Sequence, residues 1–237
     1  AGKLTTLVGA ELPTTVQKIN IERGLLWFQE PLVSRGVQVN YASGAFSISL
    51  SWNDGGYTNV WNTFSGLASY SFGDAGTLAF DASIVPNRDF NPGSQIYDLM
   101  YSVTSGSWFF GPYLQYQHYD AVKAGGIKLA PGAKDWGIGA LVNYTIDDHW
   151  SMGARAEYED SSGDGTAFIY GPKSNAWSFT ITPTWKKSIY FIRGEASYTT
   201  VDDYFEVPGP GGFGAGFGKN GTKGGQFRAL LETGIVF

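Results

Sequence analysis

The chain has 237 residues, of which 43% are hydrophobic, 16% aromatic and only 16% charged, with 33 glycines and no cysteine. The lack of cysteine excludes a disulfide framework and a thiolate metal site, and a net charge of -5 without a basic cluster argues against a nucleic-acid partner. Many aromatic rings and glycines with few charges are unusual for a soluble enzyme and typical of a barrel that crosses a membrane with strands.

Taken in chain order, segments of about ten residues alternate between apolar and small or polar side chains. In residues 46–52 the even positions are large and apolar and the odd ones are serine, and in residues 177–185 every even position is Ser or Thr. A period of two indicates a strand with two different faces. The pattern predicts about twelve strands, at residues 3–10, 34–43, 45–54, 62–72, 76–85, 95–104, 107–119, 135–146, 149–160, 174–185, 187–199 and 225–237.

The connections between these strands alternate between short and long. The short ones lie at residues 43–44, 73–75, 105–106, 147–148 and 186, and the long ones at 11–33, 55–61, 86–94, 120–134, 161–173 and 200–224. Outer-membrane barrels sort their connections in this way. We therefore expect one all-β domain over residues 1–237, an antiparallel up-and-down transmembrane β-barrel. It would have short periplasmic turns, long extracellular loops and both chain ends on the short-turn side.

The apolar phase of the strands is predicted to contact lipid. No stretch reaches 18 consecutive apolar residues, so membrane crossing would require a closed barrel of strands. Rings of this phase gather near both strand ends, for example Trp52 and Trp136 at one end and Trp108 and Trp150 at the other, as expected for two interfacial belts. The predicted lipid-facing midsections are Ile48, Leu50, Phe80, Leu99, Ile138, Val142, Met152, Ile181, Ile192 and Leu231.

The opposite phase is predicted to line the lumen, and most of its residues are small, as are Ser49 and Thr182. Small inward side chains favour an aqueous channel over a plugged barrel. The predicted pore-lining charges are Asp81, Asp98, Arg155, Glu157, Arg193, Glu195, Arg228 and Glu232. Either arginines face acids across the lumen and create a transverse field, or neighbouring Arg and Glu residues pair along the wall.

The first long loop contains an apolar run, residues 21–28, that is unusual for an exposed loop. One option is that the loop folds inward as a constriction and carries Lys18, Glu22, Arg23 and Glu30 towards the pore. The other is that it packs over the rim against other loops or a neighbouring subunit. Both stay open, with the inward fold as the working expectation. The glycine-rich residues 209–225 are predicted to form a mobile lid or a disordered tip.

Catalytic residues are not expected, and the chain is predicted not to be an enzyme. The two histidines are His118, on the lipid phase without a nearby serine, and His149, in a predicted turn. The acidic runs at residues 160–164 and 202–203 lack the spacing of a calcium loop. No metal site and no cofactor are predicted.

Several motifs carry a resemblance to a known family: NIERGLLW at residues 20–27, EP at 30–31, SRGVQ at 34–38, SWNDG at 51–55, YGP at 170–172, AWSFT at 176–180 and QFR at 226–228. They resemble the OmpL-like β-barrel porin family. The resemblance implies a Gram-negative outer-membrane porin with lipids, small polar solutes and ions as partners, and a homo-oligomer is compatible with it. Members look longer at the N-terminus, so strands can precede Ala1 in the native barrel.

The last strand ends on Phe237 and resembles the terminal signal that barrel assembly machinery reads. The leading functional hypothesis is a porin for passive diffusion of small polar solutes and ions. A substrate-selective channel would show a ladder of one charge sign or of rings along the lumen. A non-conducting barrel that serves as an adhesion or assembly platform would show bulky lumen residues or a plug.

Overall fold

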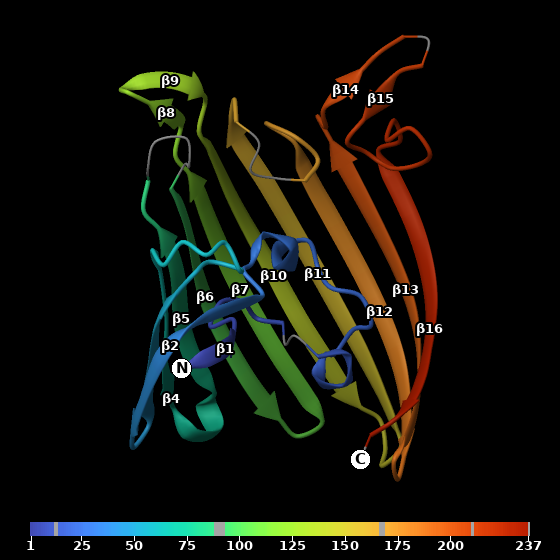
Figure 1. Ribbon diagram of the computed structural model, residues 1–237. Helices are drawn as coiled ribbons and strands as arrows, with labels where there is room; N and C mark the ends of the chain where they lie inside the picture. Colours follow the sequence, from blue (N-terminus) through green and yellow to red (C-terminus); the bar gives the residue numbers. More distant parts are fainter. Residues whose placement is uncertain (12–13, 88–92, 166–168, 210, 237) are drawn as a thin grey trace.

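The computed structural model describes residues 1–11, 14–87, 93–165, 169–209 and 211–236. Within these ranges, twelve strands form one antiparallel sheet in which each strand pairs with the next one in the chain. They are β1 (Gly2–Thr5), β2 (Val33–Ser43), β3 (Phe46–Asn53), β4 (Thr63–Ser71), β5 (Thr77–Val85), β6 (Ser94–Ser105), β7 (Trp108–Tyr119), β10 (Ala133–Thr145), β11 (Trp150–Gly163), β12 (Asn175–Lys187), β13 (Tyr190–Asp202) and β16 (Gly225–Ile235). The all-β, antiparallel, up-and-down architecture is as predicted (Figure 1).

The long connections carry small elements of their own. Two hairpins, β8 (Val122–Ala124) with β9 (Ile127–Ala130) and β14 (Glu206–Val207) with β15 (Phe213–Gly214), stand at one end of the sheet (Figure 1). The 3-10 turns in the described residues are η1 (Thr15–Gln17), η2 (Leu26–Gln29) and η3 (Gly73–Ala75). In the described part of residues 209–225, Phe213 belongs to β15 and Phe217 bridges to Lys223. Within the described ranges, no helix is long and apolar enough to span a membrane.

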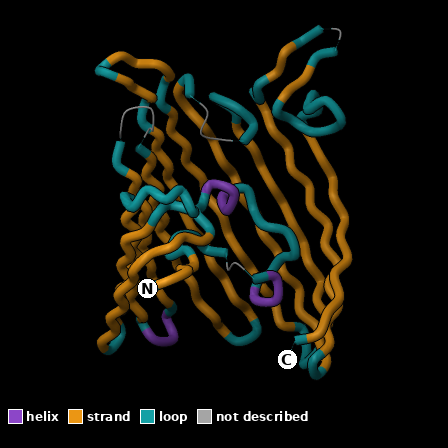
Figure 2. Tube along the Cα trace, viewed as in Figure 1, coloured by secondary structure: helices purple, strands orange, loops and turns teal. Residues whose placement is uncertain are grey.

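The short turns gather at the end of the sheet opposite these hairpins (Figure 2). Gly44 and Gly106 adopt φ values of 57° and 55° there, a region that glycine enters without steric cost. The C-terminal strand ends on this side, since Ile235 pairs with Tyr190. The predicted Phe237 signal lies outside the described residues.

The N-terminal strand is shorter than predicted. It ends at Thr5, and Gly2 pairs with Gly36, so the chain starts partway along β2 rather than at the short turns. The reason is local. The Thr6 hydroxyl accepts a hydrogen bond from the Val8 amide at 2.9 Å, and Gly9 has a φ of 101°. Both features turn the chain away from the ladder.

The curved sheet has two edges. β1 covers β2 only from Val33 to Gly36, and among the described residues no ladder joins β16 to β1 or β2. One edge is therefore β1 together with residues 37–43 of β2, and the other is the outer side of β16. The described strands form the predicted barrel wall without a pairing that closes it.

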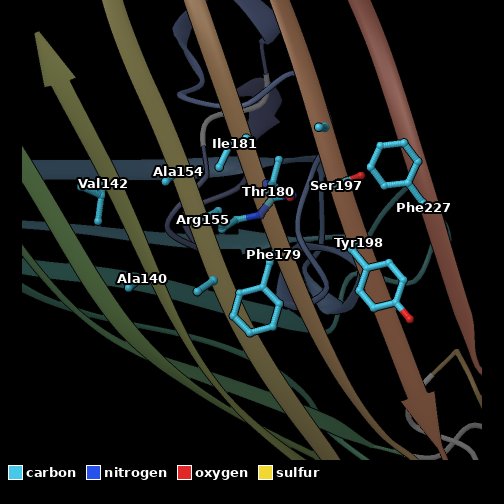
Figure 3. Close-up of a pocket in the computed structure, with 12 residues that line it drawn as sticks. Ala140, Val142, Ala154, Arg155, Phe179, Thr180, Ile181, Ser197, Tyr198 and Phe227 are labelled. Atoms are coloured by element: carbon cyan, nitrogen blue, oxygen red, sulfur yellow. The ribbon is translucent and has the colours of Figure 1, made fainter. Parts of the chain in front are cut away.

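The two faces of the sheet differ as the alternation predicted. On the convex face Leu50, Ile181 and Leu231 are exposed, whereas Asp81 and Thr182 on the concave face are fully buried. Figure 3 shows part of the convex face, where Phe179, Tyr198 and Phe227 surround a shallow apolar hollow of about 440 Å³ floored by alanines. A face this apolar and exposed fits lipid rather than water.

Aromatic rings mark both borders of the convex face. Near the long loops Tyr158 packs against Trp136 and Trp177, with ring centroids 5.4 and 4.6 Å apart. Near the short turns Trp108 packs against Tyr144 at 4.5 Å. These are the two predicted belts, and they set the height of the wall in the membrane.

Candidate functional site

Residues 6–11 and 14–32, here together called the inner segment, lie against the concave face of the sheet (Figures 1 and 2). Asn20 donates from its side-chain amide to the Thr182 hydroxyl at 2.8 Å, and the Gly9 amide donates to Asp81 at 3.1 Å. These contacts reach strands β12 and β5, far apart in the sheet. The inner segment therefore crosses the interior of the wall, which is the inward arrangement of the two considered.

The apolar run of the inner segment is buried in two places. Leu26 has no exposed surface and packs with Tyr113 and Leu141 of the wall. Leu25 packs with Tyr170 and Val201, and loop rings such as Phe217 pack against that cluster. The run thus contacts both the lumen wall and the long loops, so burial of apolar area holds the middle of the inner segment in place.

Wall carboxylates accept the backbone N–H groups of the inner segment. Glu195 accepts from Ile21 and Glu22 at 2.5 and 3.0 Å and also from the Thr182 hydroxyl at 2.8 Å. Glu157 accepts from Leu25 at 2.9 Å and from the Tyr113 hydroxyl at 2.8 Å. An irregular buried backbone needs such partners for its donors, and charged acceptors make the stronger bonds.

The two buried arginines bind the inner segment from the same wall. Arg155 donates to Glu11 at 3.0 Å and to the Glu22 carbonyl at 2.9 Å, and it pairs with Glu157 at 3.1 Å. Arg193 donates to the Lys18 carbonyl at 2.9 Å and pairs with Glu232 at 2.6 Å. Pairing along the wall is therefore observed, and neither guanidinium faces Asp81 across open water.

The inner segment also meets a cluster of acidic residues, here called the acidic corner, which consists of Asp81 of β5, Asp98 of β6 and Glu30. Asp81 and Asp98 are directly paired in the ladder and both are buried. Glu30 is buried near them and accepts a long hydrogen bond from Gln115 at 3.4 Å. Burial, with the negative charge of Asp98 as the next cause, holds the pKa of the Glu30 carboxyl well above its ordinary value.

Acidic residues also meet Gln29 of the inner segment. Its side-chain amide donates to Asp135 at 2.7 Å and to Glu159 of the neighbouring strand. The described residues hold no group of three or more His, Cys, Asp or Glu arranged to bind a metal ion. Asp135 and Glu159 accept hydrogen bonds from Gln29 of the inner segment.

The remaining predicted pore residues are more accessible. Ser49 is half-exposed on the concave face, opposite Leu67 in the ladder. Arg228 is exposed and pairs with Glu22 at 2.7 Å. Lys18 is half-buried, and the Arg23 guanidinium lies 3.8 Å from the Trp27 ring centroid. Glu22 thus contacts a wall residue, whereas Arg23 stacks on Trp27 within the inner segment.

Some site residues were not among those predicted. Tyr113, Gln115 and Asp135 all point inward from β7 and β10. Their strands were predicted correctly, so the alternation extended through residues 107–119 and 135–146 carries the signal that finds them. Glu11 and Gln29, in contrast, have no periodic signal because they lie in the irregular inner segment.

The two histidines lie apart from this site. The His149 amide donates to Asp147 at 2.7 Å within an exposed turn. The His118 ring lies 3.2 Å from Asp120, and its ladder partners are Lys134 and Gln95. No nucleophilic side chain is paired with either histidine among the described contacts.

The sequence was compared with known protein families and with curated proteins. The sequence matches the family described as "Putative beta-barrel porin-2, OmpL-like" over residues 1–237. No curated protein matches the sequence.

Solved outer-membrane proteins share the fold. OmpT of Vibrio cholerae superposes with a TM-score of 0.65 at 12% identity, over 99% of this chain and 75% of that one. The outer-membrane channel DcaP of Acinetobacter baumannii gives 0.63 at 9% identity, over 85% and 65%. A porin refined at 1.8 Å gives 0.56 at 13% identity, over 86% and 62%.

Proposed function

Because the chain belongs to the OmpL-like β-barrel porin family and is a β-barrel protein of the bacterial outer membrane, we propose that it forms a water-filled channel for passive diffusion of small polar solutes and ions. The family and the solved neighbours are those of channel proteins. No catalytic role and no cofactor are proposed.

One observation carries the proposal: the inner segment narrows the interior while part of the concave wall stays accessible. The segment is bonded to β11, β12 and β13 through Glu157, Thr182 and Arg193. On β3 and β4 Ser49 and Ser69 keep partly exposed side chains. A polar route beside a fixed constriction suits solutes that keep their hydration.

The proposed partners follow from the two faces. Lipids of the outer membrane cover the convex face, and small polar solutes and ions pass along the concave one. Barrel assembly machinery would insert the chain, and the two sheet edges and the apolar convex face are compatible with a homo-oligomer. No nucleic acid is proposed, since the net charge is -5.

Single-channel recording in planar bilayers tests the proposal with a matched pair of variants. Ser49→Trp adds a large ring to the lumen face, and Leu50→Trp adds the same ring to the lipid face of the same strand. The wild-type chain should conduct, Ser49→Trp should conduct less, and Leu50→Trp should leave conductance unchanged.

Two outcomes would contradict this proposal. A wild-type chain that inserts without conducting would favour the non-conducting platform, because the inner segment would then act as a plug. Equal effects of the two tryptophans would mean that the concave face is not the conducting path.

A further inference from the structure

A cavity smaller than the hollow on the convex face lies between the inner segment and β16. Its volume is about 200 Å³, and its polar lining consists of Lys18, Glu22, Arg23 and Arg228. Ile21, Trp27 and Phe28 complete the lining. The cavity therefore combines three cationic side chains and one carboxylate with an apolar wall that includes two aromatic rings.

The acids nearest to this cavity already have donors. Both oxygens of Glu195 accept backbone N–H groups of the inner segment, and Glu232 accepts from Arg193 and from the Thr15 hydroxyl. The acidic corner with Asp81 and Asp98 is buried beneath the inner segment. The lining of the cavity itself holds three cations and one carboxylate, so these side chains carry a net positive charge.

The surroundings of Lys18 agree with this charge balance. Burial lowers the pKa of Lys18, and although the Glu11 carboxylate opposes that shift, the positive charges of Arg23 and Arg155 add to it. A diffusible anion in the cavity would relieve this repulsion between cations.

The pair of Arg228 with Glu22 suggests what the cavity accepts. The two terminal nitrogens of the Arg228 guanidinium lie 2.7 and 3.0 Å from the two carboxylate oxygens of Glu22. The Arg228 side chain is 43% exposed and that of Glu22 25%, so solvent reaches the pair and a solute carboxylate can compete with Glu22 for the guanidinium. A planar carboxylate of a solute fits the same guanidinium fork.

We propose that this cavity is a transit site for small aromatic carboxylates, which Arg228 and Lys18 bind through the carboxylate while the ring packs beside Trp27 and Phe28. The proposal rests on the proposed channel function and names a solute class for it. A cavity of about 200 Å³ is smaller than the usual pocket for a drug-sized ligand, so the bound group is a single ring. Weak binding suits a site that a solute must also leave.

The test uses the full chain in planar bilayers with sodium benzoate as the probe. Benzoate should reduce the chloride current in a saturable manner, and benzamide, its neutral analogue of similar shape, should not. Arg228→Gln should weaken the benzoate effect about tenfold, as expected for the loss of a charge-assisted hydrogen bond. Glu22→Gln should strengthen it by removing the competing carboxylate.

Two controls keep the test specific. Lys128→Gln removes an equal charge from the exposed strand β9 and should leave the benzoate effect unchanged. Inorganic phosphate should act more weakly than benzoate, because it lacks the ring. Equal potency of phosphate and benzoate would overturn the assignment to aromatic carboxylates.

The outcomes separate this inference from the proposed function. A channel that conducts but ignores benzoate would overturn the inference and leave the channel intact. For a chain that folds without conducting, saturation-transfer NMR in micelles measures benzoate binding directly, and binding lost in Arg228→Gln would support the site. If Arg228→Gln does not fold, Glu22→Gln decides, and a benzoate effect no stronger than in wild type would overturn the proposal.

Discussion

The two walls of the lumen use their polar side chains in different ways. On β3 to β5 serine hydroxyls bond to one another across the ladder, Ser47 to Ser69 at 2.8 Å and Ser65 to Ser83 at 2.9 Å. On β11 and β13 long charged side chains such as Arg155 and Glu195 bond to the inner segment. Side-chain length explains this difference between the walls. A serine hydroxyl reaches only a residue of the adjacent strand, whereas an arginine is long enough to reach the inner segment.

The difference indicates which wall holds the constriction and which leaves room for water. The charged wall is bonded at several points, since Glu195, Arg155 and Arg193 have partners in the inner segment and Arg193 also pairs with the neighbouring strand. The serine wall has no comparable set of bonds to that segment among the described residues. Variants of the two walls should therefore behave differently.

The largest effect is expected from Arg155→Gln on the charged wall. It leaves Glu11 and Glu157 buried without their common cation, and breaking such a buried pair costs about 3 to 5 kcal/mol. The inner segment should loosen and conductance should rise. Denaturant titration and single-channel recording measure the two effects.

Ser49→Gln on the serine wall is the matched control for this change. It should cost little stability, because Ser49 is only half-buried. Similar losses of unfolding free energy in Arg155→Gln and Ser49→Gln would contradict the contrast between the walls.

A second prediction compares the two faces of one strand. Leu50→Arg places a charge on the lipid face and should cost about 2 to 4 kcal/mol if the residue lies near the bilayer midplane. Ser49→Arg places the same charge in the lumen and should cost little. Folding titrations in lipid vesicles measure both, and equal costs would contradict the assignment of the convex face to lipid.

The third prediction concerns pH and the inner segment. Burial raises the pKa of Glu11 and of Glu30 above the ordinary value of 4.5. The stability that these carboxyls contribute is present below about pH 4.5, and it is lost as the pH rises through their folded pKa values. Protection of the inner-segment amides from hydrogen exchange should therefore fall with rising pH, after correction for the intrinsic exchange rate.

Glu30→Gln provides the control for the pH effect, because an amide does not titrate. Its pH dependence should be flatter than that of the wild-type chain, and amides of β3 and β4 should respond in neither protein. If the protection of the inner-segment amides from hydrogen exchange increases with pH, the predicted direction of the pH effect is wrong.

The smallest effect is expected from Ser47→Ala on the serine wall. It removes one hydroxyl bond to Ser69 at a partly exposed position, which is worth about 1 kcal/mol or less. Conductance should not fall, since the lumen becomes slightly wider. A clear drop in conductance, measured in the same bilayers as Arg155→Gln, would indicate that the serine hydroxyls take part in conduction.

The sequence by itself determined the strands and their faces. Alternation with a period of two is a local property of the chain, so it placed Ile181 outward and Thr182 inward without knowledge of any distant residue. The short and long connections, the two aromatic belts and the family resemblance were readable for the same reason. The first strand was the exception, because the turn at Thr6 and Gly9 is set by side-chain and glycine geometry rather than by period.

Only the tertiary structure decided what the charged lumen residues contact. The bonds of Ile21 to Glu195 and of Leu25 to Glu157 join residues 174 and 132 positions apart. The inner segment that makes these bonds has no periodic sequence pattern from which its position could be predicted. An arginine on the inward phase can face water, a neighbouring strand or a second layer with the same local pattern. Burial of Leu26 against Tyr113 and Leu141 draws the inner segment onto the wall, and that packing fixes the partners of Arg155 and Arg193.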